Sequence, residues 1–92
     1  MPKLVKTVGQ TGDKIGPLFL APGQGVEIDV TGLSASALAL QRYYAPGETP
    51  VVVTTDLSAP LTYTPAARQY LELVCTDYQG DAPVLRFTYE EA

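Results

Sequence analysis

Few residues in this sequence have the chemistry of a catalytic group, and their spacing does not favour catalysis. Glu27 and Asp29 are two residues apart in an alternating segment. Both carboxylates therefore face the same solvated side of a strand, where nothing raises the pKa of one of them, as hydrolysis by paired acids requires. Cys75 is the only cysteine, and the chain has no histidine to act as its base. Because Cys75 follows Leu71 and Leu73 with a period of two, we expect a buried thiol and no catalytic residues.

Two glycine-containing segments have a superficial similarity to ligand-binding loops. The sequence DYQGD, from Asp77 to Asp81, places carboxylates around a glycine but lacks the terminal Glu and the number of oxygens that a calcium loop provides. A plain connection in which Asp77 bonds to nearby backbone is the simpler interpretation. The sequence GQTG, from Gly9 to Gly12, precedes a strand pattern, whereas a phosphate loop precedes a helix. We expect neither a metal nor a cofactor.

The charge of the chain excludes two classes of partner. Ten acidic and six basic residues give a net charge of −4. Binding to phosphate backbones requires clustered basic residues. Here they occur singly along the chain, at Lys3, Lys6, Lys14, Arg42, Arg68 and Arg86. We therefore expect no binding to nucleic acid, and the negative sign also disfavours anionic membrane surfaces.

The length and polarity of the chain favour a small domain with protein partners. Ninety-two residues make one domain, near the lower size limit for a single core. Only 17% of the residues are charged, against roughly 25% in typical soluble domains. This favours a surface partly covered by a partner or by other copies, although Thr, Ser and Gln could solvate it instead. No apolar run is long enough for a signal peptide or a membrane span, so we expect a soluble chain made in the cytoplasm.

The elements that must position these residues are short strands. Proline and glycine interrupt the chain so often that no interval fits an amphipathic helix, and the segments between are rich in Val, Thr, Tyr and Leu. Seven to eight short strands predict an all-β antiparallel sandwich, of jelly-roll or immunoglobulin-like type, without substantial helix. The predicted strands are 3–8, 15–21, 25–31, 36–44, 50–55, 60–64, 69–76 and 83–90.

The N-terminal segment has two interpretations. Residues 1–13 are predicted to form a strand or arm followed by a polar linker, and residues 14–92 the β-sandwich domain. An arm carrying Leu4 and Val5 on a flexible hinge could add a strand to a neighbouring subunit. Alternatively, it is the first strand of its own sheet.

Arg42 occupies an unusual position for a charged residue. If Leu38 and Leu40 point inward, the period of two also points Arg42 inward, but near the end of its strand. Its methylenes can lie on Leu40 while the guanidinium stays at the rim of the sandwich. We predict that Arg42 holds this end of the sandwich or an intersubunit contact, paired with one of the carboxylates of Glu48, Asp56 or Glu72.

Tyrosines supply the other candidate contact residues. Tyr43 and Tyr70 fall on the strand faces opposite the core leucines, and exposed tyrosines are enriched at protein interfaces. Carbohydrate stacking would use the same residues, although the chain has no tryptophan to accompany them. The predicted interface residues are Arg42, Tyr43, Tyr44, Tyr70, Leu4 and Val5.

Several segments together resemble a group of small β-sandwich virion proteins of tailed bacteriophages. In that group a strand ending in Leu-Gln-Arg precedes a turn, and an apolar strand ends near Cys-Thr-Xaa-Tyr before a glycine-containing loop. This chain differs by having Ala-Pro-Gly-Glu in place of an Asp/Gly-rich turn with a nearby tryptophan. The matching segments are Leu40-Gln41-Arg42, Pro46-Gly47-Glu48, LTYT at 61–64, LELVCTDY at 71–78 and Leu85-Arg86-Phe87.

The resemblance implies a non-enzymatic structural role on the exterior of the virion head. It implies a decoration or cement protein that binds the major capsid protein and itself, with a trimer favoured over a dimer, and stabilises the head by multivalent contacts. A head-fibre, collar or tail element is the less favoured location. A second functional hypothesis is a carbohydrate- or receptor-binding module that uses the exposed tyrosines.

Overall fold

The computed structural model describes residues 1–91. This range contains eight antiparallel strands joined by turns and loops, and no helix. Every strand lies where the sequence predicts it, with ends that differ by one residue at most, because proline and glycine mark the turns on both sides. The strands are β1 (Lys3–Thr7), β2 (Lys14–Leu20), β3 (Val26–Thr31), β4 (Ala37–Tyr43), β5 (Val51–Thr54), β6 (Leu61–Tyr63), β7 (Gln69–Asp77) and β8 (Val84–Tyr89).

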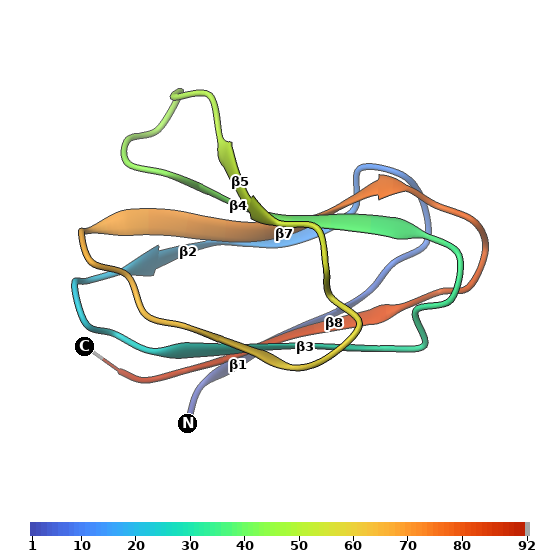
Figure 1. The fold of residues 1–92 in the computed structure, drawn as a ribbon, viewed down its shortest axis with the longest axis horizontal. Helices are drawn as coiled ribbons and strands as arrows, with labels where there is room; N and C mark the ends of the chain where they lie inside the picture. The colour runs from blue at the N-terminus through green and yellow to red at the C-terminus, as the bar shows by residue number, and fades with distance from the viewer. Residues whose placement is uncertain (92) are drawn as a thin grey trace.

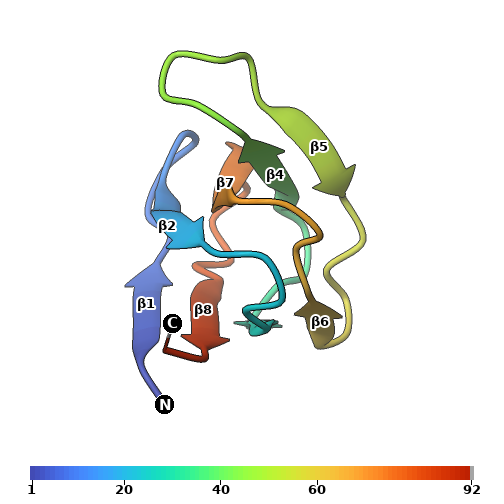
Figure 2. The ribbon, with the colours of Figure 1, turned by 90° about the vertical axis from the view of Figure 1, so that its left-hand side faces the viewer.

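The strands form two packed sheets with the order of a jelly roll (Figure 1). One sheet has the order β1-β8-β3-β6 and the other β2-β7-β4-β5. The pairs β1 with β8, β2 with β7, β3 with β6 and β4 with β5 are all antiparallel, as in a long hairpin rolled into two sheets. This order decides between the two sandwich types that the sequence leaves open. Figure 2 shows β5 and β6 at one side of the sandwich and β1 and β2 at the other.

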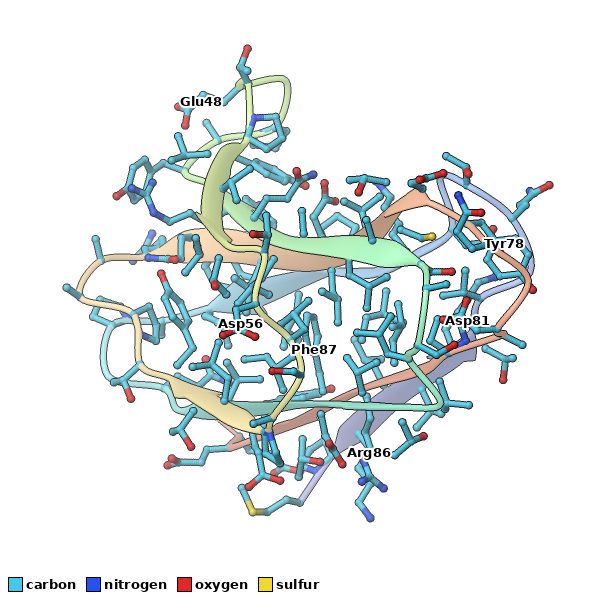
Figure 3. All side chains as sticks on the ribbon, turned by 45° about the vertical axis from the view of Figure 1, so that its right-hand side comes forward. Glu48, Asp56, Tyr78, Asp81, Arg86 and Phe87 are labelled. Carbon is cyan, nitrogen blue, oxygen red and sulfur yellow. The ribbon has the colours of Figure 1, made fainter. Side chains whose placement is uncertain are left out.

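The core lies between the sheets and follows the predicted alternation. Val26 and Ile28 of β3 are buried, as are Leu85 and Phe87 of β8, and Phe87 lies between the two layers (Figure 3). In β7 the inner residues Leu71, Leu73 and Cys75 are buried as expected. Burial raises the pKa of the Cys75 thiol, which therefore stays protonated.

The N-terminal segment is built into the sandwich of its own chain. β1 pairs with β8 along its full length, and Val8 after it is completely buried. The polar segment that follows is attached to β7, because the Gly12 amide donates to the Cys75 carbonyl and the Cys75 amide donates to the Asp13 carbonyl, both at 2.8 Å. The structure of this single chain therefore matches the interpretation of a first strand in its own sheet.

β2 contains one irregularity, at Gly16-Pro17. The register between β2 and β7 shifts between Ile15 and Leu18, and the peptide bond before Pro17 is cis. Gly16 has a φ of 96°, and a Cβ added there would lie 2.6 Å from the Leu71 carbonyl oxygen. Glycine is thus required by both conformation and space.

In the described part of the chain, no helix has the length and apolar character needed to cross a bilayer.

Candidate interaction surface

The outer face of the β1-β8-β3-β6 sheet is polar. Glu27 is exposed, as predicted, and Asp29 pairs with Arg86 of the neighbouring strand, with 2.6 Å between Oδ2 and the guanidinium. Arg86 projects outward from the sandwich in Figure 3. The sequence predicted the carboxylates on a solvated face but did not predict the ion pair across strands. This face has the side chains of an ordinary solvent-exposed sheet.

The outer face of the β2-β7-β4-β5 sheet carries three aromatic rings side by side, which we call the aromatic row. Phe19 lies opposite Tyr70 in the strand register, and Tyr70 lies opposite Tyr43. The ring centroids of Phe19 and Tyr70 are 5.3 Å apart, and those of Tyr43 and Tyr70 are 5.2 Å apart and stacked. Phe19 is 47% exposed, and the two tyrosines are half-buried. The structure thus brings two predicted residues together with a third that the sequence analysis missed.

A buried carboxylate supports the aromatic row on the same face. Glu72 is only 4% exposed although it points away from the core. Its carboxylate accepts hydrogen bonds from Lys14 Nζ at 3.1 Å and from Gln41 Nε2 at 2.5 Å, which joins β2, β7 and β4. Burial, and then the negative charge of Glu72, raise the pKa of Tyr43. The Tyr43 hydroxyl is therefore a neutral group at physiological pH.

Arg42 lies at the rim of the sandwich, where the sequence predicted it, but the predicted ion pair is not formed. It is opposite core residue Leu71 in the register, and its guanidinium stacks on the Tyr44 ring at 4.7 Å from the centroid. Among residues 1–91 the two ion pairs are instead Lys14 with Glu72 and Arg86 with Asp29.

The reason is that each candidate carboxylate has other partners or another orientation. Glu72 is on the opposite face of the sheet from Arg42. Glu48 accepts a hydrogen bond from the Tyr44 amide at 2.9 Å, and Asp56 accepts from the hydroxyl of Ser58 at 2.7 Å. A cation on an aromatic face is the alternative that remains for Arg42.

β5 presents three exposed valines next to this end of the sheet. Val51 is 52% exposed, Val52 53% and Val53 36%, and neighbouring Tyr44 is 48% exposed. The sequence predicts these valines only as part of strand 50–55. The available signal was the lack of alternation, because a strand with one buried face alternates apolar with polar residues, whereas TPVVVTT does not.

Leu4 and Val5 lie apart from the other predicted interface residues, because β1 belongs to the other sheet. Val5 is 60% exposed on the polar outer face. Leu4 packs partly against the core. The predicted set is therefore divided between two faces.

The DYQGD segment holds two loops together. The Asp81 carboxylate accepts hydrogen bonds from the amides of Ser34 at 2.7 Å, Ala35 at 3.0 Å and Ser36 at 3.1 Å, and from the Ser36 hydroxyl. These bonds, the one from the Ser36 hydroxyl above all, hold the pKa of Asp81 well below its usual range. We expected Asp77 to bond to nearby backbone, but its carboxylate accepts a hydrogen bond from the Gln79 side chain. The carboxylate that binds backbone amides is that of Asp81, and those amides belong to the distant loop between β3 and β4. Within residues 1–91 no cluster of three or more potential metal ligands occurs.

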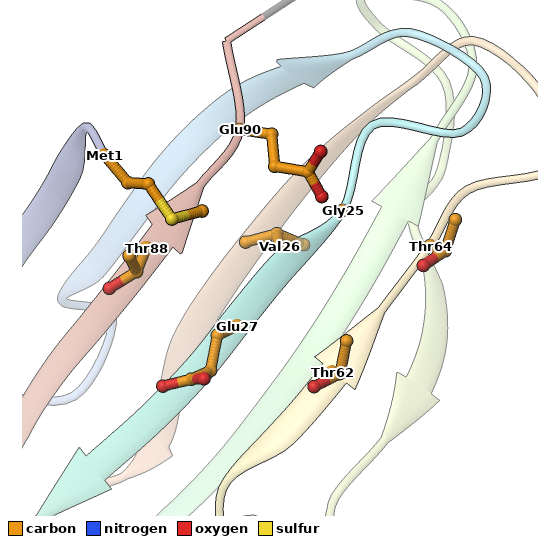
Figure 4. A pocket seen from close by; sticks show the side chains of 8 residues that line it. All are labelled: Met1, Gly25, Val26, Glu27, Thr62, Thr64, Thr88 and Glu90. Carbon is orange, nitrogen blue, oxygen red and sulfur yellow. The ribbon is translucent and has the colours of Figure 1, made fainter.

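A shallow depression of about 230 Å³ lies at one end of the polar outer face (Figure 4). It is smaller than the roughly 300–1,000 Å³ of typical small-molecule sites. Threonine hydroxyls and two carboxylates surround it, and no lysine, arginine or cysteine side chain lines it. Its lining residues are Met1, Gly25, Val26, Glu27, Thr62, Thr64, Thr88 and Glu90.

No protein-family model, curated protein or solved structure matches this chain. Its function is therefore inferred from the strand order and from the contrast between the two outer faces.

Proposed function

We propose that this chain is a non-enzymatic virion structural protein, a decoration or cement protein that binds the major capsid protein on the exterior of the head. The observation that carries the proposal is the difference between the outer faces. One has the aromatic row and the exposed Val52 around the Lys14–Glu72 ion pair, whereas the other has the Arg86–Asp29 ion pair and threonines. A protein that lies on a larger particle needs one face for docking and one for solvent. The jelly roll is also an architecture found in capsid proteins.

The aromatic row suits repeated weak contacts. Tyr43 and Tyr70 are already stacked, so binding would cost little additional side-chain entropy. The Lys14, Glu72 and Gln41 contacts hold the three strands beneath the rings in register. Each copy would contribute a modest interface, and many copies on one particle would add their effects through neighbouring capsid subunits.

The experiment is to purify virus particles from cells that carry this gene and to measure the chain in them by quantitative mass spectrometry. We expect a fixed ratio to the major capsid protein. Phe19→Ala with Tyr70→Ala should reduce that ratio at least about tenfold, as expected for loss of central aromatic contacts. Val5→Ala, on the other outer face, is the matched control and should leave the ratio unchanged. Absence of the chain from particles in which every other structural protein is present would contradict the proposal.

The second candidate is a carbohydrate- or receptor-binding module of a head fibre or tail. The observation in its favour is the exposed ring of Phe19 on the same face as the polar Lys14 and Gln41, since sugar sites combine a stacking ring with hydrogen-bonding groups. A glycan-binding screen separates the two candidates. Binding that Phe19→Ala abolishes, by a chain that does not associate with heads, would favour the second.

A further inference from the structure

The four edge strands of the two sheets differ in how they are protected against pairing with another chain. An edge strand exposes unpaired amides and carbonyls, and proteins protect such edges with lysine, proline, bulges or short length. β1 carries Lys3 and Lys6, and β2 is interrupted by Pro17 and a shift in register. β6 is only three residues long, and Pro60 and Pro65 lie on either side of it. Each of these three edges is poorly suited to accept a further strand.

β5 is protected less than the other three edges: it is short, with four residues, but it carries no charge and no proline within the strand. No charged residue occurs between Glu48 and Asp56, and Pro50 precedes the strand rather than interrupting it. β4 covers one edge of β5, and the other edge has no neighbour in the sheet. Among residues 1–91, no turn or loop backbone hydrogen bond involves Val51–Thr54. β5 does contain one residue more than β4 at Val53, but this bulge adds neither a charge nor a proline to the edge.

We propose that β5 pairs antiparallel with β5 of a second copy about a two-fold axis, which makes one continuous eight-stranded sheet. The sequence of β5 is compatible with pairing between two identical copies. With the axis between Val52 and Val53, valine and threonine are the only residues opposite one another within the strand. Glu48 and Asp56 then fall opposite uncharged residues of the partner subunit, so no like charges meet. A strand from an unrelated protein would need this neutral, β-branched pattern by coincidence.

A stable dimer must bury more surface than β5 alone provides, so residues beside β5 must also take part. A stable interface buries roughly 800 Å² per partner, about one sixth of the 4946 Å² exposed by this chain. Four paired residues do not reach that area. The β4–β5 loop projects beyond the sandwich beside β5 and carries Glu48 (Figures 1 and 3). It is ordered by hydrogen bonds from the Glu48 amide to the Ala45 carbonyl and from the Tyr44 amide to the Glu48 carboxylate. In the dimer this loop and Tyr44 would pack beside the partner subunit's β5.

The test is sedimentation velocity of the full chain from about 1 µM to about 500 µM, a range that covers weak dimers. We expect a concentration-dependent shift to twice the monomer mass. Val52→Lys should raise the dissociation constant at least about tenfold, because lysine is the residue that natural edges use against pairing. Val5→Lys, at an equally exposed position on edge strand β1, should leave it unchanged. Circular dichroism and thermal melting of both variants confirm that the monomer stays folded.

Hydrogen exchange locates the contact. Amides of Val51–Thr54 should become protected as concentration rises, while those of β1 should not change. A monomer over the whole range, a trimer of the kind that the sequence favoured, or a dimer that Val52→Lys leaves intact would each overturn the proposal. Protection of β5 only when the chain binds virus particles would identify a foreign strand as the occupant, and would equally overturn it. The inference does not depend on the virion role, because it concerns the purified chain alone.

Discussion

Single residues show what alternation in a sequence can and cannot predict. The period of two correctly placed Arg42 toward the inner side and Glu72 toward the outer side of the same sheet. It did not predict that Glu72 would be buried on the outer face, because Lys14 and Gln41 cover it from neighbouring strands. It also did not identify the contact of Arg42 with the Tyr44 ring, because Tyr44 follows the end of β4, where alternation no longer applies. Alternation determines the face of a residue, but contacts across strands determine its partners.

Gly16→Ala is expected to destabilise the protein through a close backbone contact. The added Cβ would lie 2.6 Å from the Leu71 carbonyl oxygen, at a φ of 96° that alanine rarely adopts. Conformational strain of this kind costs about 1–3 kcal/mol, and the contact adds to it. Urea unfolding measures the change in the free energy of unfolding.

Gly47→Ala is the matched control for that prediction. Gly47 has a φ of 87°, and a Cβ there would meet nothing within 4 Å. In this variant the free energy of unfolding should fall only by the cost of the backbone strain, without a contribution from a steric contact. Equal losses in the two variants would contradict a role for the Leu71 carbonyl.

At the scale of elements, strand positions were predictable but the links between loops were not. The turns are marked locally by proline and glycine, which is why the strand ends agree with the sequence to within one residue. The contact of Asp81 with Ser34 and Ser36 joins the β7–β8 loop to the β3–β4 loop. No local pattern connects residues so far apart in the chain. The strand order brings the two loops of the Asp81 link together, and the same order leaves β5 at the edge of its sheet.

The Asp81 link should make stability depend on pH in acid. Because the folded-state pKa lies below the value of about 3.9 in unfolded chains, this carboxylate stabilises the fold above that pH. The stabilisation is lost as the pH falls toward the folded-state pKa. Asp81→Asn should therefore lower the melting temperature by several degrees at pH 7 and flatten its decline between about pH 4 and pH 2. Thermal melts at a series of pH values measure both effects.

Asp77→Asn controls for the loss of an acidic residue in the same loop. The Asp77 carboxylate accepts a hydrogen bond from the Gln79 side chain but does not bind the β3–β4 loop. This variant should keep the pH dependence of the original chain. The same flattening in both variants would mean that the Asp81 hydrogen bonds are not its source.

For the whole molecule, the sequence predicted an antiparallel sandwich but not the order of its strands. Eight alternating segments fit a jelly roll and an immunoglobulin-like sandwich equally, because alternation shows which side chains are buried and not which strands are adjacent. Residues 1–13 illustrate this point. From the sequence they could be an arm or a first strand, and only the pairing of β1 with β8 distinguishes the two in this chain. The candidate surface was predictable to the same extent: Tyr43 and Tyr70 were identified by their face, but the contribution of Phe19 from β2 was not.

Removal of residues 1–13 tests whether β1 is required for the fold. The deletion exposes the Leu85 and Phe87 side of the core and removes Val8, which is completely buried and whose amide donates to the Pro83 carbonyl at 2.9 Å. Loss of the Val8 side chain alone costs roughly 1.5–3 kcal/mol, from a total of about 5–14 kcal/mol expected for a domain of this size. With the β1–β8 ladder also lost, we expect no cooperative thermal transition at any temperature, and partial recovery when a peptide of residues 1–13 is added. A shortened chain that melts cooperatively near the temperature of the full one would show that residues 14–92 fold alone and that the N-terminal segment is free to pair elsewhere.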